Sequence, residues 1–137
     1  MGVHYHKRLS GHSDADVLTH AIIDAVLGSV GESDIGTHFP DTDPKHRGAS
    51  SIELLKSAVD KAHGLGYRVI NIDSVVICEE PKLNPFIPSM KEKLAVALMV
   101  SSQFIGIKAT TNEGMGFVGR GEGIAAQAVV LMEMAGE

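Results

Sequence analysis

The sequence predicts a single α/β domain of two layers, in which helices pack against a β-sheet. Its 137 residues are enough to form one domain with a buried core. Apolar residues make up 44% of the chain and charged residues 21%, which argues against disorder. Helical and strand patterns alternate without an internal repeat or a low-complexity linker, so we expect one domain over residues 1–137.

The first predicted element is an apolar helix near the N-terminus. Ser13 or Asp14 is a candidate N-cap, and the helix is expected from about Ala15 to Leu27, where Gly28 ends it. A turn-rich stretch over Ser33–Gly48 follows, and its length is typical of a functional loop.

The rest of the chain contains two further helices and at least two strands. We expect a helix that begins at a capping box formed by Ser50 and Glu53 and ends at about His63. A strand over Tyr67–Cys78 and a loop over Glu79–Pro88 should follow it. The next expected elements are a helix over about Ser89–Val100, a strand over Phe104–Thr110 and a glycine-rich loop over Asn112–Gly123. Periodicity leaves Ile124–Met134 open between helix and strand.

Composition argues against several classes of protein. The formal net charge is −5 and no run is rich in Lys or Arg, so a nucleic-acid groove is not expected, although a few basic residues could hold a small phosphate ligand. No stretch approaches the roughly 20 apolar residues of a membrane span. The first ten residues lack the apolar region of a secretory signal. Cys78 is the only cysteine, which excludes an intrachain disulfide and fits a reducing compartment.

A polar stripe on the first helix is the first candidate for chemistry. Asp16, His20 and Asp24 recur at a spacing of four and therefore share one helix face. His12 is expected just before the helix N-terminus, where backbone N–H groups favour an anion. An enzyme that uses a divalent metal ion to act on a phosphate substrate would need such a combination of acidic side chains, imidazole and anion site. A solvated helix face with an ordinary N-cap explains the same spacing.

Two further clusters lie in loops. Asp34, Asp41 and Asp43 could accept hydrogen bonds from sugar or polyol hydroxyls or bind a hard cation, or they could form a solvated acidic turn. The stretches 108–113 and 116–123 combine adjacent hydroxyls, a carboxylate and a lone Arg among glycines. This combination suggests polyphosphate with a metal ion, and its alternative is a glycine-rich hairpin. It is neither a Walker loop nor a dinucleotide fingerprint.

The segment Gly11–His20, which reads GHSDADVLTH, closely resembles a motif of the 2-C-methyl-D-erythritol 2,4-cyclodiphosphate synthase family. The resemblance continues in order over nearly the whole chain, through Asp34-Ile35-Gly36, Phe39-Pro40-Asp41-Thr42-Asp43, Pro81-Lys82, Lys108-Ala109-Thr110-Thr111, Gly116-Phe117 and Gly119-Arg120-Gly121-Glu122-Gly123. It implies a mixed β-sheet packed against helices, a homotrimer with active sites between subunits, and a strand over Ile124–Met134.

The resemblance also implies the reaction of a metal-dependent phosphorus–oxygen lyase of non-mevalonate isoprenoid synthesis. The 2-phosphate of 4-diphosphocytidyl-2-C-methyl-D-erythritol 2-phosphate (a CDP-methylerythritol phosphate) would attack the β-phosphorus of the diphosphate, and CMP would leave. The family implies a location in the bacterial cytoplasm, or in the plastid stroma if a transit peptide has been removed.

The family assigns roles to the matching positions. His12 and Thr111 would stabilise the transition state, His20 would bind a zinc-type ion, and Glu113 would bind magnesium or manganese together with the diphosphate. The segment Cys78–Asn84 would form the cytosine pocket. The expected substrate contacts are His12, Ser13, Asp34, Ile35, Gly36, Phe39, Pro40, Asp41, Thr42, Asp43, Cys78, Glu79, Glu80, Pro81, Lys82, Leu83, Asn84, Thr110, Thr111, Asn112, Glu113, Phe117 and Arg120.

The sequence departs from the family at the metal site. Family members carry an Asp-x-His pair on an earlier strand, whereas no such pair precedes His12 here. We therefore expect an N-terminally truncated domain with an uncovered sheet edge and weak zinc binding, because catalytic zinc normally has three protein ligands. His4 and His6 are alternative ligands. Competing functions are a non-catalytic trimeric module that binds a cytidine nucleotide or a diphosphate metabolite, and a metal-binding scaffold that uses His4, His6 and His20.

Overall fold

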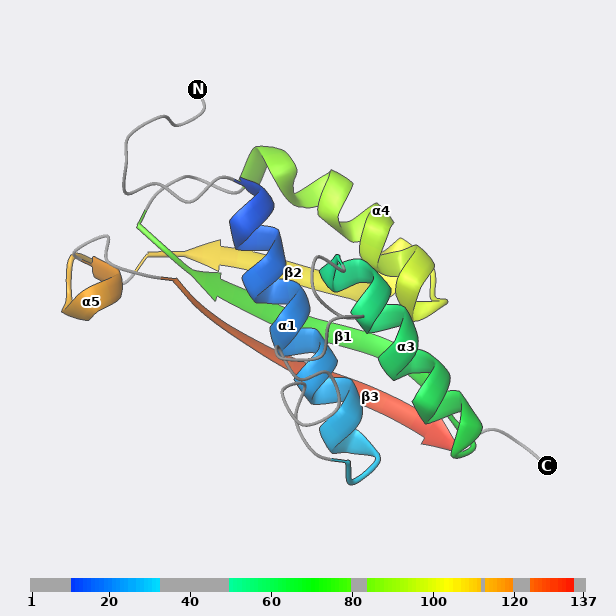
Figure 1. Ribbon diagram of the computed structural model, residues 1–137. Helices are drawn as coiled ribbons and strands as arrows, with labels where there is room; N and C mark the ends of the chain where they lie inside the picture. The colour runs from blue at the N-terminus through cyan, green and yellow to red at the C-terminus, as the bar shows by residue number, and fades with distance from the viewer. Residues whose placement is uncertain (1–10, 33–49, 80–83, 112, 120–123, 135–137) are drawn as a thin grey trace.

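The computed structural model describes residues 11–32, 50–79, 84–111, 113–119 and 124–134 (Figure 1). In chain order the elements are α1 (Gly11–Ser29), α3 (Ser51–Gly64), β1 (Tyr67–Ile77), the 3-10 helix η2 (Asn84–Phe86), α4 (Ile87–Leu98), the 3-10 helix η3 (Ser102–Phe104), β2 (Ile105–Thr110), α5 (Gly116–Gly119) and β3 (Ala125–Met134).

The sheet of the described residues has three strands in the order β2-β1-β3. β1 and β2 run parallel, with Ile77 opposite Thr110, and β1 and β3 run antiparallel, with Ile77 opposite Ala125. The predicted mixed sheet is therefore confirmed, and the strand implied for 124–134 is correct. This register brings the ends of β1 and β2 and the start of β3 to the same end of the sheet.

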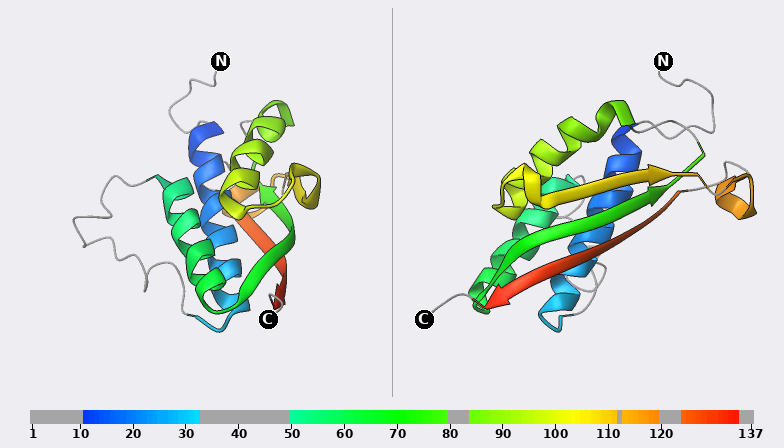
Figure 2. Two further views of the ribbon diagram at one scale, coloured as in Figure 1. Left: turned by 90° about the vertical axis from the view of Figure 1, so that its right-hand side faces the viewer. Right: turned by 180° about the vertical axis from the view of Figure 1, so that it is seen from behind.

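Three helices cover one face of this sheet and form the second layer. α1 packs against β3, β1 and α3, while α4 packs against α3 and β2 (Figures 1 and 2). The largest fully buried side chains are aliphatic and come from both layers: Leu18, Ile22, Ile23, Val26 and Leu27 of α1, Leu55 and Val59 of α3, Ile72 and Val76 of β1, Leu98 of α4 and Ile105 of β2. The predicted two-layer α/β domain is confirmed. None of the helices in the described residues has the length and apolar character needed to cross a bilayer.

α1 begins earlier than the sequence pattern predicts. The expected N-cap was Ser13 or Asp14, but the helix starts at Gly11 and includes both residues. A Ser and an Asp are tolerated in the first turn, where a negative charge interacts favourably with the helix dipole. As a correction, His12 lies inside the first turn of α1 and not before it.

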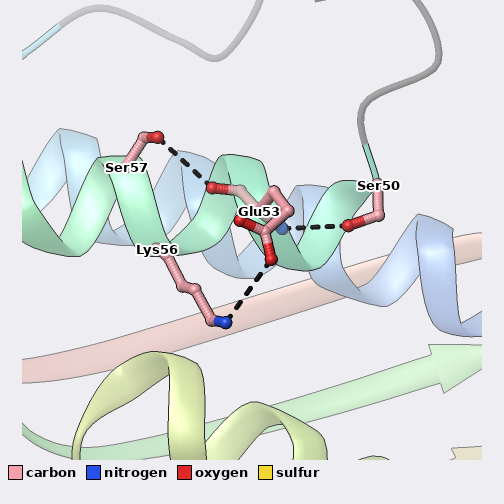
Figure 3. Close-up of polar contacts among 4 residues, drawn as sticks. All are labelled: Ser50, Glu53, Lys56 and Ser57. Atoms are coloured by element: carbon pink, nitrogen blue, oxygen red, sulfur yellow. Dashed lines mark hydrogen bonds and ion pairs between the residues drawn. The ribbon is translucent and has the colours of Figure 1, made fainter.

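α3 has the predicted cap but only one half of the predicted capping box (Figure 3). The Ser50 side chain accepts a hydrogen bond from the backbone N–H of Glu53 at 3.1 Å. The Glu53 carboxylate lies 3.4 Å from Nζ of Lys56, one turn further along the helix. The helix then ends at Gly64, one residue after the predicted end.

The third predicted helix is displaced towards the N-terminus. α4 starts at Ile87 because Pro88 occupies its first turn, a position where the missing N–H of proline costs nothing. The expected loop before it contains the 3-10 helix η2, and the expected glycine loop contains the single turn of α5.

The far face of the sheet is not covered by any described helix (Figure 2, right). Val129 and Leu131 of β3 are 72% and 58% exposed on it. Two ion pairs cross the same face, one between Arg68 and Glu133 and one between Lys108 and Asp73. β3 pairs only with β1 among the described residues and is an edge strand of this sheet. The domain thus presents an apolar strip framed by charges.

Candidate active site

The candidate active site is built around the paired ends of β1 and β2. The backbone N–H of Cys78 donates to the carbonyl oxygen of Thr110 at 2.9 Å, which extends the pairing one residue beyond β1. The segment predicted to bind cytosine therefore starts beside the Thr pair predicted to bind the diphosphate. This contact brings two sequence clusters into one place, although the paired residues Ile77 and Thr110 are 33 positions apart in the chain.

The start of the predicted cytosine segment is well packed. The Cys78 side chain is buried, at 5% exposed, and Glu79 is half-buried. Asn84 is exposed at the start of η2. Residues 80–83 lie outside the described part of the chain. Because Cys78 belongs to the hydrophobic core, its own contribution to a ligand would be made through its backbone.

The turn after β2 presents two hydroxyls and a carboxylate. Oγ1 of Thr111 accepts a hydrogen bond from the backbone N–H of Glu113 at 3.2 Å, and Oγ1 of Thr110 donates to the Thr111 carbonyl at 3.4 Å. Glu113 has a positive φ of 54°, which turns the chain back at this point. All three side chains are exposed. A hydroxyl that accepts one bond keeps its own proton to donate, so Thr111 can donate to a phosphate oxygen.

The glycines after this turn serve a contact within the protein. Gly114 and Gly116 have φ values of 78° and 68°. A Cβ placed on Gly119 would lie 2.1 Å from the carbonyl carbon of Gly114, and the N–H of Gly119 donates to the Met115 carbonyl at 2.9 Å. The sequence pattern predicted a glycine-rich loop here and suggested a polyphosphate ligand with a metal ion. In the described residues, the close approach at Gly119 is to Gly114.

The polar stripe of α1 lies on one exposed helix face, but its members have different surroundings. The carboxylate of Asp16 accepts a hydrogen bond from the hydroxyl of Ser51, the first residue of α3. His20 and Asp24 lie further along the same exposed face. Asp16 therefore serves a helix–helix contact, a partner that the spacing of the stripe did not reveal.

Several predicted positions lie outside the described residues or side chains. His12 and Ser13 belong to the first turn of α1 and Phe117 belongs to α5, but their side chains are not described. Outside the described residues altogether are Asp34, Ile35, Gly36, Phe39, Pro40, Asp41, Thr42, Asp43, Glu80, Pro81, Lys82, Leu83, Asn112 and Arg120, together with His4 and His6.

Comparison with known proteins decides the family. A model of the YgbB family matches residues 1–133.

This chain belongs to the YgbB family.

Relatives in this family with high identity have the name that the sequence motifs suggested. The chain is 56% identical over 129 residues to the 2-C-methyl-D-erythritol 2,4-cyclodiphosphate synthase of Geotalea uraniireducens, covering 94% of this chain and 82% of that protein. It is 53% identical over 128 residues to the synthase of Pelobacter propionicus, covering 93% and 81%. The family resemblance drawn from the motifs is confirmed.

Solved structures of proteins named IspDF and IspF share the fold. The bifunctional IspDF of Campylobacter jejuni is 45% identical with a TM-score of 0.84, covering 93% of this chain and 34% of that one. The IspF of Plasmodium falciparum in complex with CDP is 27% identical with a TM-score of 0.77, covering 88% and 72%. The similarity therefore extends to the arrangement of helices and strands.

The described side chains of this YgbB member offer few metal ligands. Among them, no group of three or more His, Cys, Asp and Glu residues could hold a metal ion. His20 supplies one imidazole, so the described residues alone do not fit a catalytic zinc with three protein ligands. Glu113 supplies one exposed carboxylate, which fits the usual binding of magnesium by one or two carboxylates plus substrate phosphates.

Sequence reasoning missed two polar contacts beside these residues. Ser51 follows the N-cap of α3 and had no motif to mark it, yet its hydroxyl reaches Asp16, 35 positions earlier. Lys108 was grouped with the phosphate cluster, but its ammonium pairs with Asp73 across β1 and β2. Gly106 permits this pairing, because a Cβ there would lie 3.1 Å from Oδ1 of Asp73.

Proposed function

We propose that this chain converts 4-diphosphocytidyl-2-C-methyl-D-erythritol 2-phosphate to 2-C-methyl-D-erythritol 2,4-cyclodiphosphate and releases CMP. The identity of 56% to a synthase of that name supports the reaction. The observation that carries it in the structure is the pairing of Cys78 with Thr110, because the segment proposed to bind the base then starts beside the turn proposed to bind the diphosphate. The identity to relatives that are named as synthases does not favour a non-catalytic binding module.

In the proposed reaction an oxygen of the 2-phosphate attacks the β-phosphorus in line. A new P–O bond closes the ring, the bond to the CMP phosphate breaks, and CMP leaves with the electron pair. Little covalent chemistry falls to the protein, which positions the two phosphates and stabilises charge on the transferring group. Thr111 would donate its hydroxyl proton to a phosphoryl oxygen, and His12 would act from the first turn of α1.

The divalent ions form part of the same proposal. Glu113 would hold magnesium or manganese together with the diphosphate, and the ion would neutralise phosphate charge when bound. His20 would provide one ligand to a zinc-type ion. Because the described residues supply only that imidazole, we derive no step that passes through zinc.

We further propose that the functional unit is a homotrimer with shared sites. The uncovered face of the sheet supports this assembly, since the exposed Val129 and Leu131 of β3 share that face with the half-buried Val75 and Ile77 of β1. Burying such a surface against copies of the same chain would remove apolar area from water. The exposed hydroxyls of Thr110 and Thr111 would then be enclosed by a second subunit.

The test separates binding from turnover. CDP is expected to bind the 137-residue chain in calorimetry without added zinc, because Cys78–Glu79 and the Thr pair do not need that ion. CMP release from the full substrate is then measured with magnesium alone and with magnesium plus zinc. No binding at millimolar CDP, or no CMP release under either condition, would contradict the proposed function.

Zinc affinity is the second part of this test. We expect zinc to bind weakly, with a Kd on the order of millimolar, if His20 is the main ligand, since a single imidazole does not hold the ion tightly. A His4→Ala/His6→Ala double variant is the control. Tight zinc binding that the double variant abolishes would show that these two residues act as ligands.

A further inference from the structure

The contact between Asp16 and Ser51 joins α1 and α3. The hydroxyl of Ser51 donates to a carboxylate oxygen of Asp16. α1 and α3 lie side by side over the sheet (Figures 1 and 2). The two residues come from the first turn of α3 and from the start of the second turn of α1. Each helix is therefore held near its N-terminus by the other.

Burial makes this bond more than an incidental surface contact. Ser51 is buried, at 9% exposed, while Asp16 is exposed to solvent. A buried hydroxyl without a partner is unfavourable, so Ser51 needs the acceptor that Asp16 provides. A hydrogen bond to an ionised carboxylate is also stronger than one between neutral groups. The pair consequently resists separation of the two helix starts.

The position of Asp16 relates the contact to the reaction. His12 and Ser13 lie one helical turn before Asp16 in α1. Helix ends fray most readily, and the first turn of α1 would be free to do so if nothing fixed it laterally. The bond to Ser51 acts immediately after the turn that carries His12 and Ser13.

We propose that Asp16 and Ser51 are positioning residues, which hold the first turn of α1 so that His12 and Ser13 meet the substrate in one geometry. This inference rests on the proposed function, because it assigns the pair a purpose in that reaction. Asp16 thereby has a role other than metal binding. Neither residue touches the substrate in this proposal, and both act through His12 and Ser13.

The first measurement is hydrogen exchange in the isolated chain. In Ser51→Ala, the amides of Ala15, Asp16 and Val17 are expected to exchange about tenfold faster, which is the fold-change for loss of one hydrogen bond to a charged group. Ser57→Ala is the matched control, since its hydroxyl donates to the Glu53 carbonyl within α3 and reaches no other helix (Figure 3). Asp16→Asn retains an oxygen acceptor and is expected to stay within about twofold of the unsubstituted chain.

The second measurement is CMP release in the same variants. We expect kcat to fall about tenfold in Ser51→Ala and Asp16→Ala with KM changed less than about twofold, because a positioning defect weakens interactions made in the transition state. Asp16→Asn should restore most of kcat. A structural role alone would change thermal stability without this split between kcat and KM.

The outcomes distinguish this inference from the function on which it rests. Failure of the unsubstituted chain to release CMP contradicts the proposed function. Unchanged exchange at residues 15–17 in Ser51→Ala overturns the positioning role by itself, whatever the activity. Faster exchange with an unchanged kcat would show that the Asp16–Ser51 contact is only structural, and this result would also overturn the positioning role.

Discussion

At the scale of single residues, the hydroxyl of Thr111 is the described group best placed to stabilise charge in the proposed reaction. It lies at the end of β2, and its orientation is set by the hydrogen bond from the Glu113 N–H at 3.2 Å. This bond leaves the hydroxyl proton for a phosphoryl oxygen. The side chain is thus oriented before substrate arrives, which is the condition under which a donor lowers a barrier most.

Replacing Thr111 by Ala is expected to lower kcat about a hundredfold, the usual cost of removing one oriented donor to transition-state charge. Thr111→Ser retains the hydroxyl and should recover activity to within about tenfold. Steady-state CMP release provides the measurement, and CDP affinity by calorimetry serves as the control for binding. Equal activity of the Ala variant and the unsubstituted chain would remove Thr111 from the proposed mechanism.

Gly119 gives a prediction about stability. An Ala at this position would force its Cβ to within 2.1 Å of Gly114 backbone, so Gly119→Ala should destabilise the chain by about 2 kcal/mol or more. Gly64→Ala is the matched control, because a Cβ there meets nothing within 4 Å. The control should be neutral or slightly stabilising. Urea unfolding measures both, and equal midpoints would argue against the Gly114–Gly119 contact.

At the scale of elements, the start of α3 shows how local signals determine a helix end. Ser50 caps the helix through the N–H of Glu53, and Glu53 is acidic in the first turn. Ser50→Ala should therefore lower the free energy of unfolding by about 1 kcal/mol. For a chain of this size, this corresponds to a drop in Tm of about 3–5 °C. Ser57→Ala, in the same helix and also exposed, should change Tm by less than about 1 °C. A Ser50→Ala variant with unchanged Tm would show that packing alone defines this helix end.

Most elements could be predicted from sequence because their signals are local. The Val- and Ile-rich run of β1 and the capping residues of α3 lie within a few positions of the structure that they specify. The start of α1 could not be predicted in this way, since Ser13 and Asp14 suit an N-cap and a first turn equally. The ambiguous last segment became β3 because β1 offered it an antiparallel partner, which periodicity cannot reveal.

Only part of the candidate site could be predicted from the sequence. Motifs marked Thr110, Thr111 and the start of the cytosine segment, and the register of β1 with β2 brings them together. The partner of Asp16 was not predictable, because the Asp16–Ser51 contact depends on how two helices pack. Spacing of four placed Asp16, His20 and Asp24 on one face, but it carried no information about what faces them.

At the scale of the whole molecule, the uncovered sheet face determines how copies of the chain would meet. Val129→Asp would place a charge on the apolar strip of β3 and is expected to convert the proposed trimer to monomers. Val96→Asp in α4 is the matched control, since Val96 is 71% exposed and Val129 is 72% exposed. Sedimentation velocity measures both variants. Trimers in both, or monomers in the unsubstituted chain, would contradict an assembly through this face.

The packing of α1 on β3 has a consequence for how the protein is made. α1 buries its apolar side partly against β3, which begins at Ala125, 96 positions after α1 ends at Ser29, so the two partners in this contact are synthesised at different times. At about 5–20 residues per second, α1 waits several seconds for its partner. During that interval Ile22, Val26 and their apolar neighbours in α1 lack the packing contacts that β3 provides. Nascent chains interrupted before β3 should therefore be held by chaperones, and the native core closes only after translation has passed residue 134.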